Sequence, residues 1–521
     1  MDENAIHQWM LECFGPIQGE MAWKQFSQLP EEMRQHIIAQ NGNQLPDPAQ
    51  VKAMLSAFTM GGLNTPGDMQ KAAEDGPINV KLAKALALNQ VQSKDSESVV
   101  SAAQAEQVSK AMSEANLWLD AVSSFDPASG KPDALTRASW VEESLASWAK
   151  FAAPVARSMN QALLQVLGSR FGNLPEGEIS GMFAGPIPIP IPEGLKDPKT
   201  LISLLGNTAF AIQLGQAAGE MSSEVHGSFD QGIALSKNSA GGLIAQNAAE
   251  YAASLELDPE EVLNFLALHE AAHARLYGSV PWLMPRFEAL ISKYARGIDI
   301  DLDAMQDQID QAVGLDPESM AGAINLGKVG MQDTEEQKEA MNSLETLLAL
   351  VDGWVDCVVW RAGMAHLPHL EQLREMMRRQ RAVGGPAEHT FETLIGLQLR
   401  PRRLREAADV WEQLTVRSSI QERDALWSHP DLLPQLPNDN PTDISVIEET
   451  GTPDSGKIPT HHADSQSSSQ ANQPQSAPSR IDWDAELNKL LDDDAHSGDK
   501  GATNNEDQPG DTGEDNHPKQ D

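Results

Sequence analysis

The chain has 521 residues and a formal net charge of -38, from 76 acidic and 38 basic side chains. So large a negative excess argues against nucleic acid or an anionic membrane surface as the main partner. Only two cysteines occur, Cys13 and Cys357, which excludes a disulfide framework and favours a reducing compartment. The first residues show no signal peptide, so we expect a cytoplasmic protein.

Hydrophobic residues make up 40% of the chain, but aromatic residues only 5%. The core must therefore be built mainly from Leu, Ala, Ile, Val and Met. Stretches rich in Ala, Leu and Gln favour helix over strand. These features predict a mainly α fold with at most a small sheet, and no stretch approaches the length of a transmembrane helix.

Short amphipathic pieces broken by Gly and Pro predict a helical N-terminal region over residues 1–95. A clearer helical pattern follows over 98–170. It carries an apolar stripe that we interpret as a core face, formed by Trp140, Leu145, Trp148, Phe151 and Val155. The alternating Pro-Ile run at 185–192 excludes a helix or a central strand. It indicates an extended connector or, as the alternative, a docking segment.

Residues 200–250 also look helical, although they contain several glycines. Next comes a strongly marked helix start, in which Asp258 suits the N-cap and Pro259 the first helical position. Glu261 has the spacing of a capping box. The helix is expected to end near Tyr277-Gly278, before Pro281.

This helix contains the pattern H-E-x-x-H as His269-Glu270-Ala271-Ala272-His273. Residues four apart lie on one face of a helix, so both imidazoles can bind one metal ion. Glu270 lies beside them, where a carboxylate can deprotonate a water. The pattern predicts a zinc hydrolase with one zinc ion per chain; the alternative is a pair of core histidines with ordinary hydrogen bonds.

Zinc in such a site needs a third protein ligand. An apolar helix expected over 335–360 contains two carboxylates, Asp352 and Asp356, that are costly to bury without a partner. Asp352 is the first choice for the ligand, with Asp356 as its alternative or as the partner of a histidine. Both aspartates could instead form ordinary ion pairs with arginines. The weaker candidates for the ligand are Glu345, His366, His369 and His389.

A hydrolase also needs a donor that stabilises the oxyanion. Tyr277, four residues after His273, is the best placed of three tyrosines, although an arginine or histidine could serve equally well. The downstream helices at 371–381 and 401–413 are basic. Their arginines could bind a substrate carboxylate or phosphate, but pairing with neighbouring acids is favoured.

After Pro437 the apolar periodicity ends, which predicts a disordered acidic tail over 437–521. One short helical motif is expected within it at 481–491, where Trp483, Leu487 and a following leucine share a face. Such a motif could dock on the protein's own domain or on a partner protein. The alternative is an inert part of the tail.

Several segments resemble the zincin-like hydrolases of actinobacteria, described as zinc-dependent metallopeptidases. They are LNFLALHEAAHARLYGSVPWL, ALTRASWVEESLASWAKFAAPVA, LVDGWVDCVV and DALWSHPDLLPQL. The similarity spans roughly residues 100–436. It implies a helical zincin-like domain with His269 and His273 as ligands and Glu270 as the catalytic residue. Related sequences are expected to have Glu-Gly where this chain has Asp352-Gly353. Some members are labelled as associated with coenzyme F420 biosynthesis.

Together these features predict a metallohydrolase domain over 96–436, acting as a zinc metallopeptidase on a peptide or protein substrate. Two alternatives stay open: a catalytically inactive scaffold or binding protein of the same fold, and a metal-dependent hydrolase of a small amide.

Overall fold

The computed structural model describes residues 3–27, 66–93, 99–171, 198–300, 334–385 and 399–437, with a few isolated positions between them. These residues lie in one compact unit, Met1–Asp443. The Pro-Ile run at 185–192, most of the 437–521 tail and its 481–491 motif lie outside the described residues.

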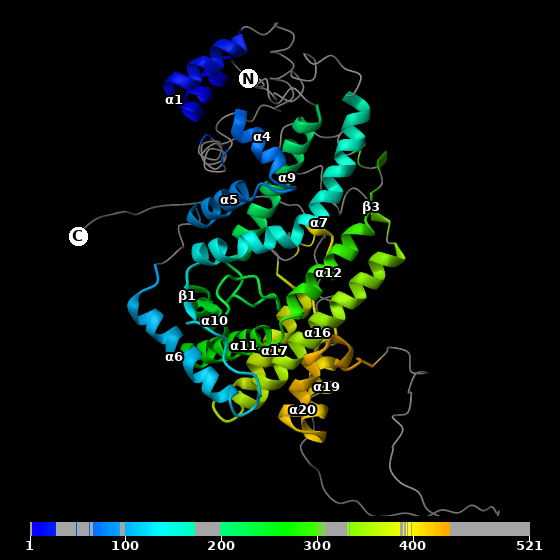
Figure 1. The fold of residues 1–521 in the computed structure, drawn as a ribbon. Coiled ribbons are helices and arrows are strands. Elements are labelled where there is room, and N and C mark those ends of the chain that lie inside the picture. The colour runs from blue at the N-terminus through cyan, green and yellow to red at the C-terminus, as the bar shows by residue number, and fades with distance from the viewer. Residues whose placement is uncertain are drawn as a thin grey trace, which may run out of the picture. The chain divides into compact units, whose positions relative to one another are not determined.

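The mainly α prediction is confirmed (Figure 1). The N-terminal part contains α1 (Glu3–Ser27), α4 (Pro66–Glu74), α5 (Val80–Ser93) and α6 (Ala102–Leu119). The central helices are α7 (Arg137–Phe171), α9 (Pro198–Met221), α10 (Ala245–Leu255), α11 (Pro259–Ser279) and α12 (Leu283–Arg296). The C-terminal helices are α16 (Glu335–Gly363), α17 (Leu370–Val383), α19 (Leu404–Arg417) and α20 (Ile420–Ala425), followed by 3-10 turns at Leu426–Ser428 and Pro430–Leu432.

The strands are short, as expected. β1 (Asp133–Leu135) pairs in parallel with β2 (Gly242–Ile244), with Ala134 opposite Leu243. β3 (Asp299–Ile300) pairs antiparallel with β4 (Met331–Gln332). None of the helices in the described ranges combines the length and apolarity that crossing a bilayer requires.

One apolar core joins the helices from α5 to α19, while α1 packs a small cluster of its own. The stripe predicted on α7 is buried, since each of its five members is at most 3% exposed. Figure 1 shows α11, which holds the H-E-x-x-H pattern, between α6 and α16, and it contacts both. The pattern therefore lies at the centre of the core.

The prediction of helix throughout 200–250 is wrong. α9 ends at Met221, and a non-helical loop fills 222–241 before β2. Gly232 and Gly241 in this loop have φ values of +69° and +71°, which a right-handed helix excludes. These glycines allow the loop to turn back against α11.

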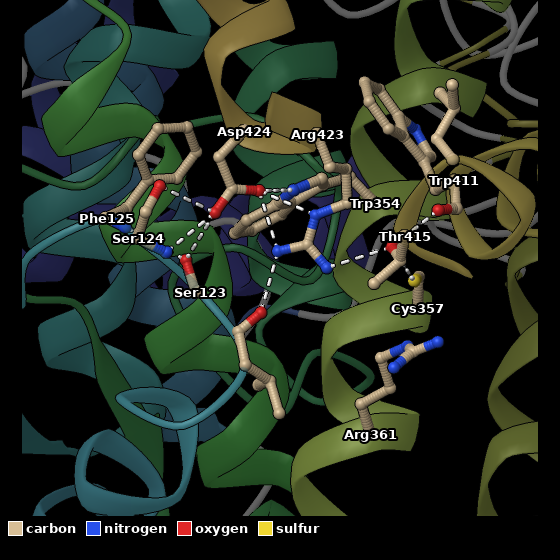
Figure 2. Close-up of polar contacts among 12 residues, drawn as sticks. Ser123, Ser124, Phe125, Trp354, Cys357, Arg361, Trp411, Thr415, Arg423 and Asp424 are labelled. Atoms are coloured by element: carbon tan, nitrogen blue, oxygen red, sulfur yellow. Dashed lines mark hydrogen bonds and ion pairs between the residues drawn. The ribbon is translucent and has the colours of Figure 1, made fainter. Parts of the chain in front are cut away.

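A buried ion pair joins α20 to the rest of the core (Figure 2). The side chains of Arg423 and Asp424 are 0% exposed and lie 2.7 Å apart. Asp424 also accepts hydrogen bonds from the Trp354 indole at 2.9 Å and from the Ser124 amide at 2.7 Å. Arg423 donates to the carbonyl of Val122 at 2.7 Å. The segment after α6 is thus fixed to α16 and α20 by charge-assisted hydrogen bonds.

Candidate metal centre

The start of α11 forms largely as the sequence predicts. The Asp258 side chain accepts a hydrogen bond from the Glu260 amide at 3.0 Å, and Pro259 occupies the first turn. The capping-box role expected for Glu261 is wrong. Its carboxylate instead accepts hydrogen bonds from the backbone amide and ring nitrogen of His369, at 2.6 and 2.9 Å. A neighbouring segment at the start of α17 supplied better donors than the helix's own first turn.

The two histidines of the pattern differ in their hydrogen bonds. Nδ1 of His273 lies 2.9 Å from the backbone carbonyl oxygen of His269, which can only accept, so Nδ1 carries the proton. Nε2 of His269 is buried and has no hydrogen-bond partner in the described part of the chain. Burial, followed by the neighbouring His273, lowers the pKa of His269 to about 4. His269 is therefore a neutral imidazole at neutral pH.

Asp352 faces these histidines from α16. Its Oδ1 lies 3.2 Å from Nε2 of His273, and its Oδ2 accepts hydrogen bonds from Nη2 and Nε of Arg381 at 2.8 and 3.1 Å. Burial alone would raise the pKa of Asp352, but the arginine charge and the histidine outweigh it and lower the pKa to about 2. Asp352 is therefore an ionised carboxylate beside the two imidazoles.

Glu270 is fixed by backbone amides of the loop before β2 and of β2 itself. Its Oε1 accepts hydrogen bonds from the amides of Ser228 and Gly242, both at 2.9 Å, and its Oε2 accepts one from Phe229 at 3.2 Å. Burial raises the pKa of Glu270 to about 7, although these amides act in the opposite direction. A carboxyl group with this pKa can accept and release a proton near neutrality.

These groups line a cavity of about 30 Å³. Its lining comprises Phe229, Asp230, Leu266, His269, Glu270, His273, Asp352, Val355, Asp356, Met377, Arg378, Arg381 and Leu404. A space of this size holds a water molecule or an ion, but not a peptide. Two imidazoles and a carboxylate are ligand types that zinc prefers, so the residues fit this metal in kind. Within the described ranges, however, no three ligating side chains are already gathered closely enough to hold an ion.

The alternative ligands are placed differently. Asp356 lines the cavity, but its carboxylate is bound by Arg374 and Arg378, at 2.5 and 2.7 Å. This residue therefore follows the alternative in which the aspartate forms ion pairs with arginines. Glu345 pairs with Arg402 at 3.6 Å. The three weaker histidine candidates are absent from the cavity lining: His366 stacks on Trp118, His369 bonds to Glu261, and His389 lies beside Arg400.

Tyr277 does not line the cavity. Its hydroxyl donates a hydrogen bond to the Gly232 carbonyl at 2.6 Å, and its ring stacks on Phe229. An oxyanion role would require this hydroxyl to leave Gly232, so that role stays a prediction. The basic helices follow the favoured interpretation, because their arginines pair with acids, for example Arg379 with Glu375 at 2.8 Å and Arg403 with Glu406 at 2.5 Å.

Sequence reasoning missed Asp230, a further carboxylate of the cavity. Its Oδ2 is bound by the backbone amide and Nδ1 of His226, at 2.5 and 3.0 Å. Sequence reasoning also missed the amides that hold Glu270. The available signal was the set of glycines in and beside this loop, Gly227, Gly232, Gly241 and Gly242. A Cβ at Gly227 or Gly241 would collide with the Glu270 carboxylate.

Two inward-facing imidazoles and a carboxylate at one buried cavity are the side chains that a metal-binding protein uses. Residues 78–443 match the family model of the zincin-like metallopeptidases, and the chain belongs to this family. Membership implies zinc binding and a hydrolase function. A structure described as a "putative hydrolase with a novel fold", from Chloroflexus aurantiacus, is similar at 16% identity and a TM-score of 0.44, covering 67% of this chain and 91% of that one. The search of curated proteins found no match.

Proposed function

We propose that this protein is a zinc-dependent metallopeptidase whose metal ligands are His269, His273 and Asp352. The observation that carries the proposal is the buried Nε2 of His269, which has no partner among the described residues and lies one helical turn from His273. A buried polar nitrogen without a partner is costly, and a metal ion would remove that cost. The Asp352 carboxylate at 3.2 Å from His273 supplies the anionic ligand.

A bound zinc ion supplies Lewis acidity and lowers the pKa of a water. Glu270 would accept a proton from the attacking water and deliver it to the leaving amine, since its pKa is raised to about 7. The amides of Ser228, Phe229 and Gly242 keep its carboxylate in one orientation. Arg381 fixes Asp352, and the backbone carbonyl of His269 orients the ring of His273.

Peptides or proteins are the substrates that we infer from the family, in a cytoplasmic setting. A catalytically inactive zincin-like scaffold is the second candidate, and the volume of about 30 Å³ favours it because a peptide does not fit without movement. A small amide is the third candidate and needs less movement. Docking by the 481–491 motif on the protein's own domain or on a partner stays a prediction.

The test begins with elemental analysis of the full chain and of His269→Ala, His273→Ala and His369→Ala. His369 is a matched control because it lies outside the cavity and bonds to Glu261 instead. We expect one zinc per chain in the wild type and the control, and loss of most zinc in the other two. Equal zinc content in all four proteins would refute the metal site.

Activity is then measured with a quenched fluorescent peptide library and a panel of small aminoacyl amides. Glu270→Gln should keep its zinc and lose cleavage, because the amide side chain cannot accept the proton. Cleavage of peptides supports a peptidase, while cleavage of the small amides alone supports the third candidate. Zinc binding with no cleavage of either set supports the scaffold.

A further inference from the structure

Three arginines of α17 point towards α16 at the edge of the metal cavity. Arg374 and Arg378 both bind the carboxylate of Asp356, and Arg381 binds that of Asp352. Arg378 and Arg381 line the cavity beside His269 and His273. These side chains are well buried, with Arg378 16% and Arg381 9% exposed.

The charged side chains of α16 and α17 at this edge of the cavity balance one another without a metal ion. Asp356 faces Arg374 and Arg378, while Arg361 is bound to the nearby Glu412 at 2.6 Å. The two carboxylates of α16, Asp352 and Asp356, thus face three guanidinium groups of α17. Asp230 on another wall, which His226 binds, adds a further negative charge opposite this surplus.

A divalent ion would disturb this balance. The carboxylate that would neutralise it, Asp352, already neutralises Arg381 at 2.8 Å. The loaded site would therefore keep a positive charge beside Arg378, in surroundings of low dielectric where an uncompensated charge is costly. An anionic ligand that enters the cavity removes this cost.

We propose that the substrate of this site carries a carboxylate close to the cleaved bond and that Arg378 binds it; this inference rests on the proposed zinc hydrolase. The bonds from Arg378 to Asp356 use Nε and Nη2, and the N–H groups of Nη1 supply the donors for a second carboxylate. A guanidinium matches a carboxylate in shape as well as in charge.

Space for the part of the substrate beyond its carboxylate lies next to the cavity. A second cavity of about 40 Å³ shares three wall residues with the first, namely Asp230, Met377 and Arg381. Methionine is flexible and adapts to its surroundings, so a turn of the Met377 side chain would join the two spaces. The carboxylate belongs either to a free C-terminus or to an acidic side chain of the substrate.

The experiment is calorimetric titration of the full-length protein with four probes. Acetyl-Ala-Ala with a free carboxylate is compared with its C-terminal amide, and acetyl-Ala-Glu-amide with acetyl-Ala-Gln-amide. Wild type, Arg378→Gln and Arg379→Gln are titrated. Arg379 is the matched control, because it is the next residue on α17 but is 66% exposed, absent from the cavity lining and paired with Glu375.

We expect wild type and Arg379→Gln to bind a carboxylate probe at least about tenfold more tightly than its neutral counterpart. Arg378→Gln should lose this preference, and Arg378→Lys, which keeps the charge but not the fork of donors, should retain part of it. The first probe pair reports a C-terminal carboxylate and the second an acidic side chain. Equal binding of charged and neutral probes by wild type, or an unchanged preference in Arg378→Gln, would overturn the inference.

Zinc content and peptide cleavage are measured on the same samples. Zinc binding and cleavage without a carboxylate preference would reject this inference and leave the proposed function standing. A carboxylate preference that depends on Arg378, in a protein that binds no zinc, would support the anion site and reject the proposed function. Thermal unfolding of each variant shows whether the fold is retained.

Discussion

Nε2 of His273 lies 3.2 Å from Oδ1 of Asp352, although 79 residues separate the two in sequence. The other nitrogen of the same ring bonds to a backbone carbonyl of α11, so the imidazole is fixed from both sides. The other oxygen of Asp352 is bound by Arg381. Three helices, α11, α16 and α17, therefore meet at one carboxylate, and its replacement should affect both metal binding and stability.

Asp352→Asn should weaken zinc binding about 10- to 100-fold, because a neutral amide is a poorer ligand than a carboxylate. The zinc affinity is measured by competition with a chromophoric chelator. Asp356→Asn is the control, since that carboxylate is bound by two arginines instead. A larger loss of zinc affinity in Asp356→Asn would identify that residue as the ligand.

Glu270 should make the metal-free protein less stable as the pH rises. Its folded pKa of about 7 is above the ordinary pKa of 4.5, so between these values the folded state holds a proton that the unfolded state has released. This contribution to the free energy of unfolding is complete below pH 4.5 and is lost as the pH rises through 7. The difference between the two pKa values corresponds to roughly 3 kcal/mol of unfolding free energy. Urea unfolding of chelator-treated wild type and Glu270→Gln measures it. Parallel stability curves for the two proteins would contradict this expectation.

Gly227→Ala should destabilise the protein by about 1–3 kcal/mol, because a Cβ at this position collides with the Glu270 carboxylate and adjoins backbone atoms of β2. The control is Gly278→Ala in α11, where the nearest atom to a new Cβ is 3.7 Å away. There the change should be neutral or stabilising by up to about 1 kcal/mol, because alanine favours helix. Chemical unfolding compares the two, and equal effects would show that the Glu270 site relaxes easily.

Removing only one partner of the buried ion pair in Figure 2 should destabilise the protein strongly. Asp424→Asn is expected to cost about 3–5 kcal/mol, because Arg423 remains fully buried with no full charge opposite it. Glu335→Gln at an exposed pair is the control and should change stability by less than about 0.5 kcal/mol. The double change Arg423→Met, Asp424→Leu should cost less than Asp424→Asn alone, as measured by urea unfolding.

The sequence predicted much of this local structure because the signals are local. Asp258 and Pro259 begin α11 as expected, and the apolar stripe of α7 is buried. The segment at 222–241 was misjudged, because isolated glycines do not by themselves reveal a positive φ. The partner of Glu261 was also misjudged, since His369 is 108 residues away and only packing brings it near.

What the sequence determined by itself is the placement of His269 and His273 on one face of one helix, with Glu270 beside them. That placement follows from the 3.6-residue turn and does not depend on any other element. The tertiary structure alone decided that Asp352 faces the imidazoles while Asp356, one turn later, faces arginines. It also decided that loop amides hold Glu270. Such contacts arise only where α11, α16, α17 and the loop before β2 pack together. Residues so far apart in the sequence produce no periodic pattern that would predict their contact.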